Sequence, residues 1–269
     1  MTDRRQIAML AGLSIGALTC FGWLLFCVHR TDCLNALSQM DSWASTGTGV
    51  VLPSAVAGVA LWLGILGWRL VRTGLQVAAL AESGERPPAL IAAMQRTGAR
   101  RVRCLAADGP TAFCAGALRP QIVVSMGLLT QMSADETDAV LLHEHEHART
   151  FEPLVRAALE SASEVFFFVP VLRWWCRRRL ENSELRADRV ALDRLGPRPV
   201  ASALLLMGGT AVLGTAAFAG VTELRVAQVL GDRLPNRAPA SPPLAMSILG
   251  SLLALQIVSC VVQALQHLG

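Results

Sequence analysis

The chain has 269 residues, 53% of them hydrophobic, and a formal net charge of +4. Its mean hydropathy of +0.45 is too high for an ordinary soluble protein, so membrane-spanning segments are expected. All the basic residues except histidine are arginines, scattered without interleaved aromatic residues, so direct nucleic-acid binding is not predicted. The seven cysteines show no C-x-x-C spacing and predict neither a disulfide framework nor a cysteine zinc site.

Four stretches without a charged residue are each long enough to cross a bilayer as a helix, and they cover residues 7–28, 49–68, 199–221 and 245–265. The first is longer than the apolar core of a typical signal peptide and is followed by a second stretch, so it is predicted to stay in the membrane. The predicted fold class is a mainly α membrane protein with about four transmembrane helices. Residues 1–72 and 199–269 would each contain two of them, and residues 73–198 would form a cytoplasmic domain.

The arginines predict the orientation of the helices. They precede the first helix and follow the second, whereas the loop at residues 29–48 contains only Arg30. The positive-inside rule therefore places the N-terminus and residues 72–198 in the cytoplasm. A single crossing by the third helix then places the last loop outside, with Arg225, Arg233 and Arg237, although the rule applied to that loop alone favours the cytoplasm.

The region between the second and third spans predicts a small α+β domain. Residues 99–106 and 112–125 are typical of short strands between turn residues. Ser133 and Glu136 form a capping-box pattern, which predicts that a helix starts there. Residues 165–172 are apolar but too short to cross a bilayer, so they predict a core or interfacial helix, and a last helix is predicted at about residues 177–194.

The capped helix contains the motif H-E-x-x-H, formed by His143, Glu144 and His147. Residues four apart lie on one face of a helix, so both imidazoles can bind one ion while Glu144 reaches the water at its open position. The motif predicts one Zn²⁺ ion, with Glu144 as the general base that takes a proton from water and delivers it to the leaving amine. His145 and Glu146 are expected to point away from the ion.

A catalytic zinc ion needs a third protein ligand besides water. Spacing alone leaves the choice open among the carboxylates that follow the motif, which are Glu152, Glu160, Glu164, Glu181 and Glu184.

An ordered set of motifs between roughly residues 101 and 195 resembles the BlaR/MecR family of membrane-embedded zinc metallopeptidases. The matching residues are Ala112-Phe113-x-x-Gly116-x-x-x-Pro120-x-Ile122-x-Val124-Ser125-x-Gly127-Leu128-Leu129, Glu136-x-x-Ala139-Val140-Leu141-x-His143-Glu144-x-x-His147-x-Arg149 and Glu184-x-x-Ala187-Asp188. In that family the glutamate of the last motif is the third zinc ligand, so the resemblance gives this role to Glu184, with Glu181 as the alternative. Asp188 is similar to a residue that orients a ligand histidine by accepting its distal N–H.

The resemblance implies a zinc-dependent endopeptidase in the bacterial cytoplasmic membrane, with its active site facing the cytoplasm, in regulatory proteolysis such as antirepressor signalling. The expected partners are a protein or peptide substrate, such as a transcriptional repressor, and the lipid bilayer, and an oligomer is compatible with the sequence. The sensors of that family carry a C-terminal penicillin-binding domain. Because this chain stops at Gly269, just after its last predicted span, direct β-lactam sensing is not expected.

Two details of the mechanism are also predicted. The strand at residues 121–125 is proposed as the sheet edge to which a substrate adds. Arg149, Asn182 and Arg186 are candidates for stabilising the oxyanion, because the chain has no tyrosine.

Two other functions remain as alternatives. One is a membrane quality-control or prenyl-protein-type zinc protease, which shares H-E-x-x-H and E-x-x-x-D but would carry two long spans between them. The other is a non-catalytic membrane signalling protein that keeps zinc for structure.

Overall fold

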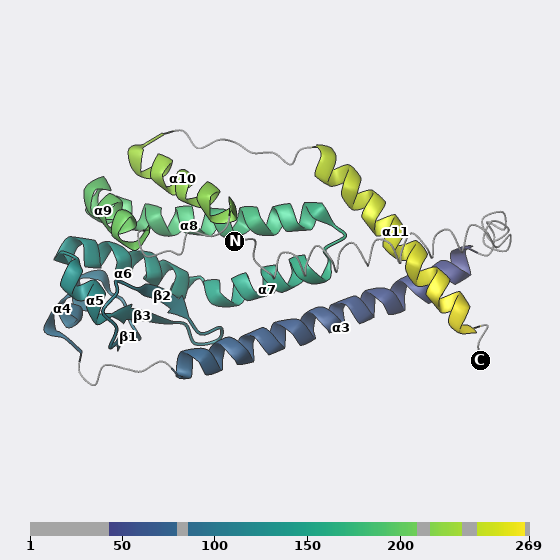
Figure 1. Ribbon diagram of the computed structural model, residues 1–269, viewed down its shortest axis with the longest axis horizontal. Helices are drawn as coiled ribbons and strands as arrows, with labels where there is room; N and C mark the ends of the chain where they lie inside the picture. The colour runs from purple at the N-terminus through teal and green to yellow at the C-terminus, as the bar shows by residue number, and fades with distance from the viewer. Residues whose placement is uncertain (1–42, 80–85, 209–215, 233–240, 267–269) are drawn as a thin grey trace, which may run out of the picture. The chain divides into compact units, whose positions relative to one another are not determined.

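The computed structural model describes residues 43–79, 86–208, 216–232 and 241–266 (Figure 1). The fold is mainly helical and divides into two compact units. Among the described residues, the larger unit lies within residues 61–244, and the smaller one combines residues 43–60 with residues 245–266. The predicted helix at residues 7–28 lies outside the described residues, and the predicted division into domains at residues 72 and 198 stays a prediction.

Helix α3 (Trp43–Ala78) contains the second predicted span. Its segment Ser54–Ala78 is the one helix among the described residues that is long and apolar enough to cross a membrane. Helix α11 (Ser241–Gln266) covers the fourth predicted span, but its apolar part, Pro243–Val258, is shorter. The count of four spans is therefore not confirmed.

The third predicted span corresponds to two described helices, α9 (Pro197–Gly208) and α10 (Ala216–Leu230), and residues 209–215 lie outside the described part. Both helices contact α8 (Pro170–Leu195) within the larger unit. Val200 and Ala203 of α9 are buried in a protein core. Packing against protein therefore explains part of the apolar character that predicted a membrane crossing here, since Leu205 is exposed.

In the part of the chain that the structure describes, three short strands form one sheet in the order β1-β3-β2. They are β1 (Val102–Leu105), β2 (Ala112–Ala115) and β3 (Gln121–Ser125). Strand β3 is parallel to β1 and antiparallel to β2. The prediction that residues 121–125 form the sheet edge is therefore wrong. Ile122, Val123 and Val124 are almost completely buried, which suits a central strand covered on both faces.

Helix α6 (Ala134–Arg149), which carries the H-E-x-x-H motif, lies between two hydrophobic cores. One core joins it to α4 (Pro88–Thr97) and the sheet, and the other joins it to α5 (Met126–Gln131), α8 and α9. Ser133 and Glu136 form the predicted capping box at its start. Because two sides of α6 are packed, its motif side chains project from a fixed helix.

Helices α7 (Glu152–Val165) and α8 lie side by side and are joined by a short turn at residues 166–169 (Figure 1). The prediction of a helix at residues 165–172 is therefore wrong, because α7 ends at Val165 and α8 begins at Pro170. Proline is favoured in the first turn of a helix, where its missing N–H costs nothing. Helix α8 is also longer than the predicted helix at residues 177–194.

The C-terminal half of α3 is bound to α7. The indole Nε1 of Trp62 donates to the carbonyl oxygen of Ala158 and to Oγ of Ser161, each at 3.1 Å. Arg69 forms ion pairs with Glu160 (3.0 Å) and Glu164. The helix that can cross a membrane therefore makes direct polar contacts within the unit that carries the motif.

Candidate metal centre

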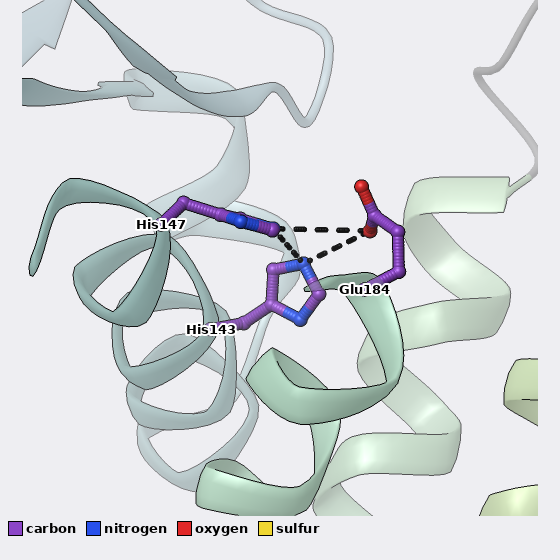
Figure 2. Close-up of side chains that lie close together, drawn as sticks. All are labelled: His143, His147 and Glu184. Carbon is purple, nitrogen blue, oxygen red and sulfur yellow. Dashed lines mark hydrogen bonds and ion pairs between the residues drawn. The ribbon is translucent and has the colours of Figure 1, made fainter. Parts of the chain in front are cut away.

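His143 and His147 of α6 and Glu184 of α8 point toward one another (Figure 2). The Nε2 atoms of the two histidines are 3.0 Å apart, and Oε2 of Glu184 lies 3.5 Å from the first and 3.8 Å from the second. Among the described residues, this is the one group of histidine, cysteine and acidic side chains close enough to hold a metal ion. Of the five carboxylates left open by spacing, the structure brings Glu184 to the histidines.

The three side chains fit a Zn²⁺ ion. In a tetrahedral zinc site with bonds of about 2.0–2.1 Å, the ligand atoms lie about 3.3 Å from one another. The observed separations of 3.0, 3.5 and 3.8 Å bracket that value. Two imidazoles and a carboxylate, with space for water, are also the ligand types of catalytic zinc sites.

Asp188 sets the orientation of His143. Its Oδ1 lies 2.8 Å from Nδ1 of His143, and the Asp188 side chain is almost fully buried. Burial raises the pKa of Asp188, but its hydrogen bonds to His143 and Arg225 lower it more, so the group is a carboxylate that only accepts. Nδ1 of His143 therefore carries the donated proton, and Nε2 is directed at the cluster, as predicted for this aspartate.

The pKa of His143 reflects the same contacts. Burial lowers the pKa of the ring, but the hydrogen bonds to Asp188 and Glu184 outweigh burial and raise it to about 9. Without a metal ion, the cluster therefore binds a proton that a metal ion would displace.

Glu184 is held between the histidines and two arginines. Arg156 of α7 donates from Nη2 to its Oε1 at 2.8 Å, and Nη1 of Arg225 lies 3.6 Å from its Oε2. Burial raises the pKa of Glu184, but the contacts with His143 and His147 outweigh it and lower the pKa far below the usual range. Glu184 is therefore charged, with Oε2 facing the imidazoles and Oε1 facing Arg156.

Arg225 is a residue of this site that the sequence did not identify. Its Nε and Nη2 donate to Oδ2 and Oδ1 of Asp188 at 2.7 and 2.8 Å, which is the two-pronged geometry of strong arginine–carboxylate pairs. The prediction that the loop with Arg225 lies across the membrane from the motif is therefore wrong, since groups in hydrogen-bond contact share one compartment. The arginine content of that loop, which favoured the cytoplasm, was the signal that could have placed it.

The remaining carboxylates are engaged elsewhere. Glu152 accepts from Oγ of Ser183 at 2.6 Å, and Glu181 pairs with Arg178 at 3.3 Å. Glu160 and Glu164 bind Arg69 of α3, as described above. Sequence spacing could not identify the third ligand among the five carboxylates, because the ligand is the one whose position on α7 or α8 faces the histidines of α6.

The predicted oxyanion groups do not reach the site. Arg149 and Arg186 both bind Glu146, at 2.8 and 3.3 Å, and Asn182 is exposed on α8. None of the three lines the cavity beside the histidines. Glu146 is thus occupied by arginines, in agreement with the expectation that it points away from the ion.

A cavity of about 740 Å³ lies beside the three side chains. Glu144 lines it next to His143, and the edge strand β2 forms one wall through Phe113, Cys114 and Ala115. Burial, with the charges of Glu144 and Glu152, raises the pKa of the Cys114 thiol to about 12. The thiol therefore stays protonated and is a poor competitor for the metal.

The comparison with known families agrees with these residues. The family model described as BlaR1 peptidase M56 matches residues 38–211, which is more than half of the chain. No curated protein matches the chain significantly. The matched range contains the motif helix α6 and Glu184. The predicted resemblance to the BlaR/MecR family is therefore confirmed, and the chain belongs to the M56 family of BlaR1-type metallopeptidases.

Proposed function

We propose that this protein is a zinc-dependent endopeptidase of the bacterial cytoplasmic membrane that hydrolyses a peptide bond at the cytoplasmic face. The observation that carries the proposal is the convergence of His143, His147 and Glu184 at a cavity that Glu144 also lines, in a chain of the M56 family.

Each polar group at the cavity has a role in this proposal. His143, His147 and Glu184 would hold one Zn²⁺ ion, which, when bound, lowers the pKa of a water molecule and polarises the scissile carbonyl. Glu144 takes the proton of the attacking water and delivers it to the leaving amine. Asp188 holds His143 in the tautomer whose Nε2 faces the cluster. Arg156 binds Oε1 of Glu184, so that Oε2 faces the two histidines.

The substrate would bind as an added strand along β2. This strand pairs with β3 on one side only, and its residues line the cavity beside the motif. Backbone hydrogen bonds to a strand edge bind a peptide with little dependence on its sequence. The apolar side chains of Val200, Leu204 and Met207 on the α9 side of the cavity favour an apolar substrate side chain.

The membrane location rests on α3 and on the family. Large apolar side chains along its candidate span, such as Leu61, Leu63 and Trp68, are exposed, which is the pattern of a lipid-facing surface. Arg69 and Arg72 lie toward the end of α3 next to the cavity, and the positive-inside rule places that end in the cytoplasm. A cytoplasmic substrate such as a transcriptional repressor, cleaved in antirepressor signalling, follows from this orientation and from the BlaR1-type family.

The proposal is tested with Glu144→Gln, which removes the base and keeps the size of the side chain. In membranes of the native host, this variant should bind zinc as the wild type does, lose cleavage, and retain uncleaved substrates that proteomics can identify. Asp193→Asn is the matched control, because it makes the same acid-to-amide change at an exposed position of α8 and should leave cleavage intact. Equal cleavage by the wild type and Glu144→Gln would refute the mechanism. A wild-type protein that binds zinc but cleaves nothing would favour the non-catalytic alternative.

A further inference from the structure

We propose that Arg225 of α10 stabilises the negative charge that develops on the carbonyl oxygen of the scissile peptide bond. The inference rests on the proposed peptidase function and adds a catalytic residue to it. Arg225 lies beyond residues 38–211, the range that the family model matches, so the active site would include a helix outside that range.

Peptide hydrolysis needs a donor at this position. When water attacks, the carbonyl oxygen becomes an oxyanion on a tetrahedral carbon, and donors already fixed in place there give one of the largest contributions to catalysis. The chain has no tyrosine that could serve. Among the described residues, the basic side chains other than the two clustered histidines that line the cavity are Arg69, Arg156 and Arg225.

Two of these three arginines are directed elsewhere. Arg69 is bound to Glu160 and Glu164 of α7. Arg156 donates to Oε1 of Glu184, which is the oxygen that does not face the histidines, and lies 3.6 Å from Glu152. Neither contact places a donor beside Oε2 of Glu184, the oxygen that approaches the Nε2 atoms of both histidines.

Arg225 places a donor, its Nη1, near this oxygen of Glu184. Its Nη1 lies 3.6 Å from Oε2 of Glu184, the oxygen that is within 3.8 Å of both histidine Nε2 atoms. Nε and Nη2 are used on Asp188, whereas Nη1 forms no hydrogen bond to any described residue. The guanidinium is therefore anchored by one edge and presents its remaining N–H groups next to the reacting atoms.

The position of Arg225 is set before substrate binds. Leu224 is buried, and Gln228 donates from Nε2 to the carbonyl oxygen of Leu185 at 2.8 Å, which holds α10 against α8. Arginine stays protonated in proteins, so the guanidinium that contacts Asp188 and Glu184 is a fixed positive charge. A fixed and charged donor needs little reorganisation during the reaction.

The competing explanation is that Arg225 acts only through Asp188, as a positioning residue for His143. The two roles differ in what they affect. A positioning role changes metal binding and all ligands of the site together, whereas oxyanion stabilisation changes only ligands that carry the tetrahedral, negatively charged group.

The experiment uses Arg225→Gln and Arg225→Lys in the full-length, detergent-solubilised protein, with Arg189→Gln, an exposed arginine of α8, as the control. Three quantities are measured, which are bound zinc per chain, the affinity for an acetylated leucine–alanine tetrapeptide amide in a Glu144→Gln background, and the affinity for its isostere with a phosphinate at the central bond. Arg225→Gln should keep its zinc and its peptide affinity and lose about 100-fold or more in phosphinate affinity. Arg225→Lys should recover part of this loss, because the charge is retained without the planar fork.

Unchanged phosphinate affinity in Arg225→Gln, or an equal loss of zinc, peptide and phosphinate binding in both variants, would overturn the inference. Failure of the proposed function is distinguishable, since it would appear in the wild type as a protein that neither cleaves nor binds the phosphinate. Arg225→Lys also keeps the test informative if Arg225→Gln does not fold.

Discussion

At the scale of single residues, the two outer histidines of the His143–His147 stretch and the inner one differ in what they face. His147 lines the cavity and has its Nε2 in the cluster, whereas His145, two positions earlier on α6, does not line the cavity. His145 is therefore a matched control for His147, because the same substitution should abolish metal binding at 147 and leave it unchanged at 145.

We expect a chelator to lower the Tm of the wild type and added Zn²⁺ to restore it, since an ion that binds only the folded protein stabilises it. At a free zinc concentration about 100 times Kd, this stabilisation is about 2.7 kcal/mol. His147→Ala should show no response to either treatment, and His145→Ala should respond as the wild type does. Thermal unfolding of the detergent-solubilised variants, with and without zinc, measures the effect. A zinc response that survives in His147→Ala and is lost in His145→Ala would contradict the assigned ligands.

The residues of the site differ in how far the sequence could predict them. His143, Glu144 and His147 follow from helical spacing within one turn, which is local information. Glu184 required the resemblance to a family, because spacing left five carboxylates open. Arg156 and Arg225 lie on other helices, and no local pattern links them to Glu184 or Asp188. Their roles depend on how α7 and α10 pack against α8, which only the fold specifies.

At the scale of elements, the first turn of α5 illustrates how the domain constrains its backbone. The N–H of Gly127 donates to the carbonyl oxygen of Ala107 at 2.8 Å. A Cβ atom on Gly127 would lie 1.9 Å from the carbonyl oxygen of Asp108, which is far inside contact distance. The atom that it meets belongs to the backbone and cannot rotate away as a side chain could. Gly109, the residue that follows Asp108, has no heavy atom within 4 Å of the position that its own Cβ atom would take.

Gly127→Ala should therefore destabilise the domain by more than about 2 kcal/mol, because overpacking against the backbone forces a main-chain shift. Gly109→Ala should change the free energy of unfolding by about 0.5 kcal/mol or less. Denaturant or thermal unfolding of the two single variants compares them directly. A Gly127→Ala protein as stable as Gly109→Ala would show that the loop at residues 107–109 yields more easily than its hydrogen bonds suggest.

The elements were predictable where a local pattern dominates. The capping box at Ser133 predicted the start of α6, and the β-branched residues within 121–125 predicted the strand β3. The order of the strands was not predictable. β1 pairs in parallel with β3, although β2 lies between them in the sequence, and short strands do not show which of them is central. The aromatic run Phe166-Phe167-Phe168 predicts a helix but forms a turn, because hydrophobicity does not distinguish a helix from the turn between two helices.

At the scale of the whole chain, an arginine within the candidate span needs an explanation. Arg69 belongs to Ser54–Ala78, yet a charge in a membrane helix is costly unless it is paired. Its two glutamate partners on α7 supply that pairing, and Trp62 of the same helix also bonds to α7. One side of α3 therefore contacts α7, and exposed apolar side chains cover other parts of the helix surface. An α3 that crosses the bilayer brings α7, and with it Arg156 and the cavity, to the membrane boundary.

The contact between Arg225 and Asp188 makes a prediction about topology, because α8 and α10 must then lie on the same side of the membrane. Glu223 of α10 and Arg189 of α8 are both exposed and suit labelling. In Glu223→Cys and Arg189→Cys, a membrane-impermeant maleimide should add label, beyond that on the seven native cysteines, in the same vesicle orientation. With a cytoplasmic active site, that orientation is inside-out. Labelling of both positions from the other side would keep the contact and reject the cytoplasmic site. Labelling of the two positions from opposite sides would reject the contact itself, and with it the role proposed for Arg225.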